Sequence, residues 1–156
     1  MSIEIERKFL ITRLPHSMGS HTGTTIRQGY LIATEDGFEL RIRQKAERFF
    51  QTIKIGEGLS RTEIEIELSA DQFSTLWPHT TGRRVSKIRY KLPVGEYTAE
   101  VDRFEGHLAG LEMVEVEFSS IEASQRFAPP SWFGAEVTED KRYKNKWLAE
   151  NGIPMD

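Results

Sequence analysis

The chain has 156 residues, no cysteine, and a formal net charge of −3 from 21 basic and 24 acidic side chains. This length fits one domain over residues 1–156, and the lack of cysteine excludes disulfide scaffolds, Cys-ligated zinc and thiol nucleophiles. The near balance of charge gives no overall attraction to nucleic acid or to an anionic membrane, and no segment approaches the roughly 20 apolar residues that span a bilayer. With no signal-peptide pattern at its start, the sequence predicts a cytoplasmic protein without nucleic-acid or membrane partners.

Alternation of apolar and charged residues predicts about eight β-strands. In chain order they cover residues 3–9, 26–33, 38–43, 49–55, 61–68, 87–92, 96–102 and 114–118. The clearest alternation is in residues 61–68, where three apolar side chains face away from Glu63, Glu65 and Glu67. Such a period of two is typical of antiparallel strands with one apolar face and one polar face.

Three helices are predicted between or after these strands. Ser69 and Gln72 form a capping-box pattern that predicts a helix reaching Trp77. A similar pattern predicts a helix within residues 119–127, and a third helix is expected over about residues 139–151 with Thr138 as its N-cap.

The charged positions are sorted by sign from strand to strand. Acidic groups are Glu4/Glu6, Glu63/Glu65/Glu67, Glu100/Asp102 and Glu115/Glu117, and basic groups are Arg41/Arg43 and Lys87/Arg89/Lys91. Like charges two residues apart share one strand face and repel each other, so a plain solvated face, which is the alternative explanation, gains little from this order. A divalent cation would relieve the carboxylates and a polyanion would relieve the cations. Oxygen ligands without cysteine favour Mg²⁺ or Mn²⁺ over zinc.

A series of short motifs along the whole chain resembles one known family. The motifs are Glu4-Ile5-Glu6-Arg7-Lys8-Phe9, Arg27-Gln28-Gly29-Tyr30-Leu31, Leu40-Arg41-Ile42-Arg43, Thr52-Ile53-Lys54, Arg61-x-Glu63-x-Glu65, Lys87-x-Arg89-Tyr90, Val101-Asp102-x-Phe104, Glu115-Val116-Glu117-Phe118 and Asp140-x-Arg142-Tyr143-x-Asn145. In this order they resemble the CYTH-domain proteins, also called triphosphate tunnel metalloenzymes, and most of all their short inorganic triphosphatase branch.

The resemblance implies a fold and an activity. The expected fold is α+β: an eight-stranded antiparallel closed β-barrel, or tunnel, with a charged interior and a few peripheral helices, including one at the C-terminus. The expected activity is the Mg²⁺- or Mn²⁺-dependent hydrolysis of a small-molecule triphosphate, most of all tripolyphosphate, to pyrophosphate and phosphate. A barrel of this size has room for one small ligand, and a homodimer would cover its apolar outside.

The resemblance also assigns roles to individual residues. The expected metal ligands are Glu4, Glu6 and Glu117, with Glu63, Glu65, Asp102 and Glu115 completing the acidic lining or binding a second ion through water. The expected phosphate-binding residues are Lys8, Arg41, Arg43, Lys54, Lys87 and Arg89. Tyr30 and Lys87 are candidates for assisting the attacking water, and Lys141 and Arg142 are expected near a tunnel mouth.

Other functions on the same kind of tunnel stay open at this point. They are a class IV-type adenylate cyclase, a thiamine or nucleoside triphosphatase, and a module that binds polyphosphate or nucleotide without turnover. No residue set clearly positions an adenine and a ribose 3′-hydroxyl, and pure anion binding would not need so many carboxylates. A purely structural role predicts that Glu4→Ala and Arg41→Ala are both tolerated.

Overall fold

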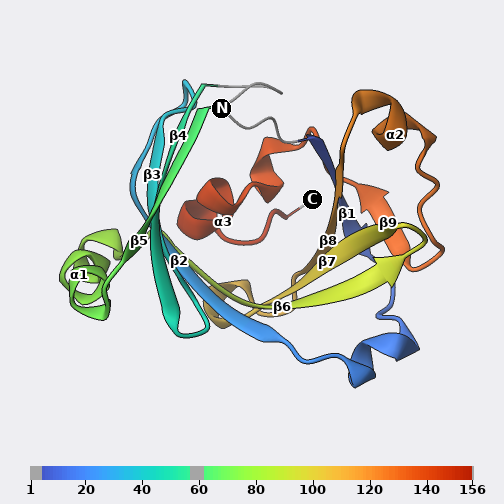
Figure 1. The fold of residues 1–156 in the computed structure, drawn as a ribbon, viewed down its shortest axis with the longest axis horizontal. Coiled ribbons are helices and arrows are strands. Elements are labelled where there is room, and N and C mark those ends of the chain that lie inside the picture. The colour runs from blue at the N-terminus through green and yellow to red at the C-terminus, as the bar shows by residue number, and fades with distance from the viewer. Residues whose placement is uncertain (1–4, 57–61, 156) are drawn as a thin grey trace.

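The computed structural model describes residues 5–56 and 62–155 (Figure 1). Nine strands form one antiparallel sheet in the order β5-β4-β3-β2-β6-β7-β8-β1-β9. The strands are β1 (Ile5–Ile11), β2 (Thr24–Ala33), β3 (Glu39–Lys45), β4 (Arg48–Ile55), β5 (Thr62–Leu68), β6 (Arg84–Val94), β7 (Tyr97–Phe104), β8 (Glu112–Phe118) and β9 (Phe133–Glu136). Eight of them match the strands expected from the alternation, and β9 was not predicted.

The prediction of a closed eight-stranded barrel is wrong. The sheet curves strongly, but among the described residues no backbone pairing joins its two edge strands, β5 and β9. Figure 1 shows the C-terminal segment lying inside the curve, between the two ends of the sheet. A closed eight-stranded barrel holds only side chains or one small ligand, whereas a helix with its side chains is about 10–12 Å wide. An open sheet is therefore what accommodates this helix.

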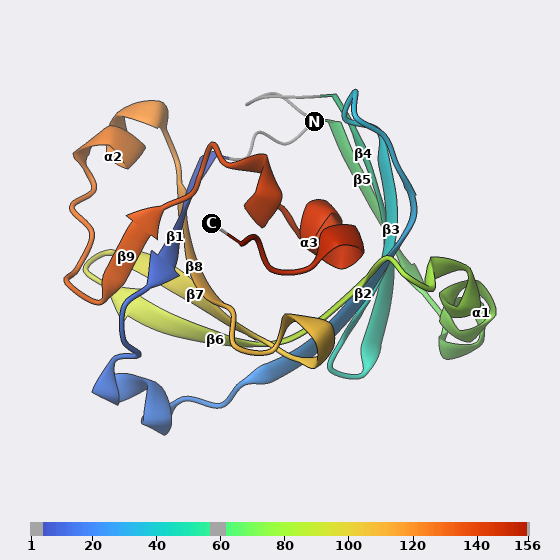
Figure 2. The same cartoon turned by 180° about the vertical axis from the view of Figure 1, so that it is seen from behind.

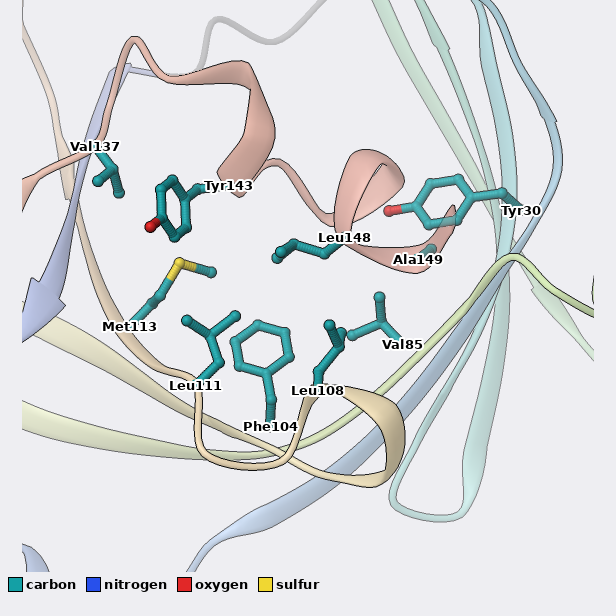
Figure 3. Packing of buried hydrophobic residues seen from close by; sticks show 10 residues of the cluster. All are labelled: Tyr30, Val85, Phe104, Leu108, Leu111, Met113, Val137, Tyr143, Leu148 and Ala149. Atoms are coloured by element: carbon teal, nitrogen blue, oxygen red, sulfur yellow. The ribbon is translucent and has the colours of Figure 1, made fainter. Parts of the chain in front are cut away.

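The C-terminal helix is thus not peripheral, which is a second correction. A 3₁₀ turn, η4 (Lys141–Tyr143), precedes α3 (Asn145–Asn151), and both lie on the concave side of the sheet in the two opposite views (Figure 2). Leu148 and Tyr143 are buried in a cluster with Tyr30 of β2 and Met113 of β8 (Figure 3). Apolar packing against strands on both sides of the curved sheet holds η4 and α3 on its concave side.

The convex side of the sheet is covered in two places. Helix α1 (Ala70–Leu76), followed by η2 (Trp77–Thr80), packs Phe73 onto Ile42 and Leu68. Helix α2 (Ile121–Arg126) and the turn η1 (His16–Ser20) lie over a second cluster that contains Phe9 and Val114. A further turn, η3 (Gly106–Leu108), connects β7 to β8. No helix in the described residues is long and apolar enough to span a membrane.

The helix predictions hold to different degrees. The capping box of Ser69 and Gln72 is present at the start of α1, as predicted. Helix α2 begins one residue later than its pattern indicated, because Ser120 is the N-cap and accepts from Ala123 N. The third predicted helix, over residues 139–151, is interrupted at Lys144, whose backbone is extended (φ −74°, ψ 143°).

Candidate functional site

The sheet order brings the basic strands together between acidic ones. Strands β4, β3 and β6 carry five of the six cationic side chains of the predicted site and form, together with β2, a continuous run of four strands in the sheet, while the sixth cation, Lys8, lies on β1. Acidic β5 lies beyond β4, and acidic β7 and β8 lie beyond β6. The sheet curves around its concave side (Figure 1), and the cavity there is lined by cations of β3, β4 and β6 and by carboxylates of β5 on one side and of β7 and β8 on the other.

A charged cavity of about 250 Å³ occupies this concave side. Since a water molecule takes roughly 30 Å³, the cavity has the size of a small ligand. Its lining residues are Glu6, Lys8, Tyr30, Glu39, Arg41, Arg43, Lys54, Glu63, Glu65, Arg89, Glu100, Glu115, Glu117, Lys144, Asn145 and Lys146. The sheet supplies the first thirteen of these and the C-terminal segment supplies the last three.

The acidic wall formed by β7, β8 and β1 contains like charges directly opposite each other. Glu6 faces Glu117 across β1 and β8, and Glu100 faces Glu115 across β7 and β8. The Glu6 carboxyl also hydrogen-bonds the Glu115 carboxylate. Burial alone would raise the pKa of Glu115, but the charge of Lys8 and this hydrogen bond outweigh it and hold the pKa below its ordinary value.

These carboxylates fit a hard divalent cation, because facing like charges destabilise a strand pair unless a counter-ion lies between them. Within residues 5–56 and 62–155, no three carboxylate or imidazole groups converge closely enough to form a metal cage by themselves. A divalent ion beside these carboxylates could take further ligands from a phosphate substrate, which is how Mg²⁺ is commonly held.

A buried ion network lies beside the cavity on β6 and β7. Lys87 Nζ lies 2.8 Å from Asp102 Oδ2, and Arg89 donates to both oxygens of the same carboxylate at 2.7 and 2.9 Å. Burial would raise the pKa of Asp102, but Lys87 and Arg89 outweigh it and hold the pKa far below the usual range. Burial also lowers the pKa of Lys87 to about 8, although Asp102 opposes this shift. Lys87 can therefore change its charge near neutral pH.

The floor of the cavity carries a guanidinium pair next to a phenol. The Arg41 Nε is buried without a hydrogen-bond partner in the described part of the chain. Burial, with Arg41 and Arg89 nearby, lowers the pKa of Arg43 to about 10. Burial and the charge of Glu39 raise the pKa of Tyr30 to about 12, so the phenol keeps its proton at neutral pH. The Arg41 Nε–H, a hydrogen-bond donor without a partner among the described residues, lies beside other cations and is suited to bind an anionic ligand.

The structure brings most of the predicted site residues together. Ten of the metal- and phosphate-binding candidates line the cavity, and so does Tyr30: the ten are Glu6, Glu63, Glu65, Glu115, Glu117, Lys8, Arg41, Arg43, Lys54 and Arg89. Lys87 and Asp102 lie beside the cavity, buried at 0% and 3% exposure. Glu4 lies outside the described residues. Lys141 lines a neighbouring cavity of about 630 Å³, while Arg142 pairs with Asp140.

Five lining residues were not among the predicted site residues. Glu39 and Glu100 alternate in phase with predicted site residues on their own strands, so the period-two pattern could have found them. Lys144 and Lys146 had no such signal, and Asn145 was marked only as the end of the last motif shared with the family, because the position of all three depends on the C-terminal segment folding into the concave side of the sheet. A surface helix with the same sequence would place these lysines in solvent.

An antiparallel sheet curved around a cavity of sorted charges agrees with the comparisons with known proteins. The CYTH domain family matches residues 2–140. An inorganic triphosphatase of Nitrosomonas europaea is 55% identical over 148 residues, covering 94% of this chain and 96% of that protein. An inorganic triphosphatase of Acetivibrio thermocellus is 33% identical over 153 residues, covering 97% and 96%. A crystal structure of an inorganic triphosphatase shares a TM-score of 0.77 and 48% identity, with 99% of each chain covered. The chain belongs to the CYTH domain family.

Proposed function

We propose that this protein hydrolyses inorganic tripolyphosphate to pyrophosphate and phosphate with the help of Mg²⁺ or Mn²⁺. The observation that carries the proposal is the charged cavity, in which Arg41, Arg43 and Lys54 face carboxylates on both sides. The names and the high coverage of the two curated relatives support the same substrate. We regard the whole chain, residues 1–156, as one catalytic domain, and its cytoplasmic location stays a prediction.

The roles follow from the chemistry of each group. Glu6, Glu115 and Glu117 would hold the ion, with Glu4, Glu63 and Glu65 as further candidates and Glu100 added from the lining. When bound, the divalent ion would neutralise the polyphosphate and polarise its terminal phosphoryl group. The phosphate oxygens would be held by Lys8, Arg41, Arg43, Lys54 and Arg89. Water would then form a bond to the terminal phosphorus while the bond to the bridging oxygen breaks, and pyrophosphate leaves.

We assign a different role to Asp102 from the metal ligation that the resemblance implied. Both of its oxygens already accept from Arg89, and one of them also faces Lys87. Asp102 would then orient these two cations beneath the substrate without touching it. This leaves the acidic residues of the cavity wall as the candidates for metal ligands.

The proposal predicts substrate- and metal-dependent turnover. Purified protein is expected to release phosphate from tripolyphosphate with Mg²⁺ or Mn²⁺, and to lose this activity in EDTA. Glu117→Gln should require more metal for half-maximal rate, because one charged oxygen ligand is lost, whereas Glu122→Gln on exposed α2 should not. Production of cyclic AMP from ATP would show that the protein is an adenylate cyclase instead. Folded protein that turns over no triphosphate would leave a binding module as the better explanation.

Lys87 predicts the pH dependence of the reaction. With a pKa of about 8, its amine is charged below pH 8 and neutral above it, so a role as proton acceptor for the attacking water makes kcat/KM rise through pH 8. Lys87→Arg should remove this rise, because the guanidinium stays charged. Lys91→Arg, exposed on the same strand, should keep it. A wild-type kcat/KM that falls through pH 8 would show that the charged form is the active one.

The homodimer also stays a proposal, and it rests on the outer face of β5. Ile64 and Ile66 are 49% and 51% exposed there, on a strand whose outer edge pairs with no other described strand. A second copy packed on this face would bury them. Light scattering should then give twice the monomer mass for the wild type and the monomer mass for Ile66→Glu. A wild-type monomer at high concentration would rule the dimer out.

A further inference from the structure

Gln28 is a fully buried polar residue that the proposed mechanism does not use. It lies on β2, two residues before Tyr30, and directly faces Arg43 of β3. A buried primary amide is unfavourable unless its groups are hydrogen-bonded. Here both ends are satisfied: Arg43 Nε donates to Gln28 Oε1 at 3.1 Å, and Gln28 Nε2 donates to Tyr30 Oη at 2.8 Å.

The contact with Arg43 fixes the orientation of this amide. A guanidinium only donates hydrogen bonds, so the carbonyl oxygen of Gln28 must face Arg43. The amide nitrogen must then face Tyr30 Oη, which accepts its hydrogen. The side chain of Arg41 also hydrogen-bonds the phenol oxygen, again as a donor. Tyr30 therefore has donors on two sides.

The consequence concerns the hydrogen of Tyr30 itself. A phenol has one hydrogen to donate, and neither Gln28 Nε2 nor Arg41 can accept it. The hydrogen must point elsewhere, and Tyr30 lines the charged cavity. The strand pairing supports this direction, because Tyr30 directly faces Arg41 across β2 and β3, and Arg41 also lines the cavity. Figure 3 shows the hydroxyl of Tyr30 pointing toward the interior of the curved sheet.

We propose that Gln28 is a positioning residue, whose amide makes Tyr30 a hydrogen-bond donor to a phosphoryl oxygen in the cavity and holds the Arg43 guanidinium in place. This inference rests on the proposed triphosphatase function. The Gln28 amide would couple two groups on neighbouring strands, the Tyr30 phenol and the Arg43 guanidinium. The hydrogen bond from the phenol would strengthen as charge develops on the transferring phosphoryl group. The guanidinium would bind the polyanion throughout the reaction.

The test is a set of variants assayed with tripolyphosphate. Gln28→Met keeps the side-chain volume but removes both hydrogen bonds, and we expect kcat to fall about 10- to 100-fold. Tyr30→Phe should cause a similar loss. Because Gln28 acts on kcat through Tyr30, the double variant should be no more than about threefold slower than Tyr30→Phe. The matched control is Gln44→Met, which removes another glutamine–arginine pair, with Arg27, between the same two strands outside the cavity.

The Arg43 contact has a readout that does not need turnover. Calorimetric titration with a non-hydrolysable imido analogue of tripolyphosphate should show a Kd raised several-fold in Gln28→Met and unchanged in Gln44→Met. This shift should persist when Tyr30→Phe is added, because it acts through Arg43. If the wild type binds the analogue but releases no phosphate from tripolyphosphate, the triphosphatase proposal fails. The binding measurement still tests the contact between Gln28 and Arg43 in that case.

Three results would overturn the inference. They are full kcat in a folded Gln28→Met, losses that multiply in the double variant, and an equal loss in Gln44→Met. If Gln28→Met does not fold in a thermal melt, Gln28→Glu takes its place. A glutamate still accepts from Arg43, but its second oxygen also accepts the Tyr30 hydrogen and turns it away from the cavity. Its kcat should therefore fall as well, and full activity of Gln28→Glu would equally rule the inference out.

Discussion

Asp102→Ala is expected to lower the free energy of unfolding by about 3–5 kcal/mol, the loss typical of breaking a buried ion pair from one side. The carboxylate lies between Lys87 and Arg89, and Lys87 has no exposed surface. Without Asp102, Lys87 would lose the main charge that keeps it protonated, so its pKa should fall below 8. The variant would have to bury an unpaired cation or a neutral amine.

Urea denaturation near pH 7 would measure this loss, with Glu67→Ala as the control. Glu67 also pairs with an arginine, Arg48, but at the exposed end of the β4–β5 strand pair, so little change is expected. The sign of the pH effect follows from the lowered pKa of Asp102. Its contribution is complete above its unfolded pKa of about 3.9 and is lost as the pH falls toward the folded value. A wild type and a variant of equal stability at pH 7 would show that the network contributes nothing.

Arg41→Ala is expected to lower kcat for tripolyphosphate about 10²- to 10³-fold, while the protein stays folded. Arg41 is buried on the cavity floor beside Tyr30 and Glu39, and its Nε has no partner among the described residues. Loss of the guanidinium would remove donors that gain strength as the phosphoryl group transfers. Since only the planar guanidinium can grip two oxygens at once, Arg41→Lys should recover binding more than rate.

The matched control for this loss is Arg48→Ala. Arg48 lies on the neighbouring strand, but its side chain is 67% exposed and pairs with Glu67 outside the cavity. Steady-state assays of phosphate release would give kcat and KM for each variant, and a thermal melt would confirm folding. If the kcat of Arg41→Ala is within threefold of the wild-type value, Arg41 is not one of the residues that bind the phosphates.

How much could be predicted from the sequence differs between the strands and their arrangement. A period of two tells which side chains share a face, so Arg41 and Arg43 were placed together correctly. The same pattern does not tell whether the ends of the sheet meet, because closure depends on what fills the inside. Here Leu148 and Tyr143 fill it, and a seven-residue helix carries no sign in its own sequence of which surface will cover it.

The buried network marks a second limit of the sequence pattern. Alternation placed Asp102 on the same face as Glu100, and both were read as members of one acidic strand. How each of them is paired depends on the register of β6 and β7: Asp102 faces Arg89 and is held at 2.7–2.9 Å by Arg89 and Lys87, whereas Glu100 faces Lys91 and lies 3.4 Å from Arg89. The register is set by pairing over the whole sheet. The sequence of a single strand therefore cannot reveal which carboxylate forms an ion pair with a buried cation.

The position of α3 inside the curved sheet has a consequence for how the protein matures on the ribosome. Synthesis proceeds from the N-terminus, so all nine strands leave the exit tunnel before residues 145–151 do. Until Leu148 and Tyr143 arrive, the buried surfaces of Tyr30 and Met113 have no cover. The nascent sheet would therefore expose an apolar concave surface. Lys144 and Lys146 would still be absent from the cavity at that time. Chaperones would find a binding surface on the nascent chain during this interval.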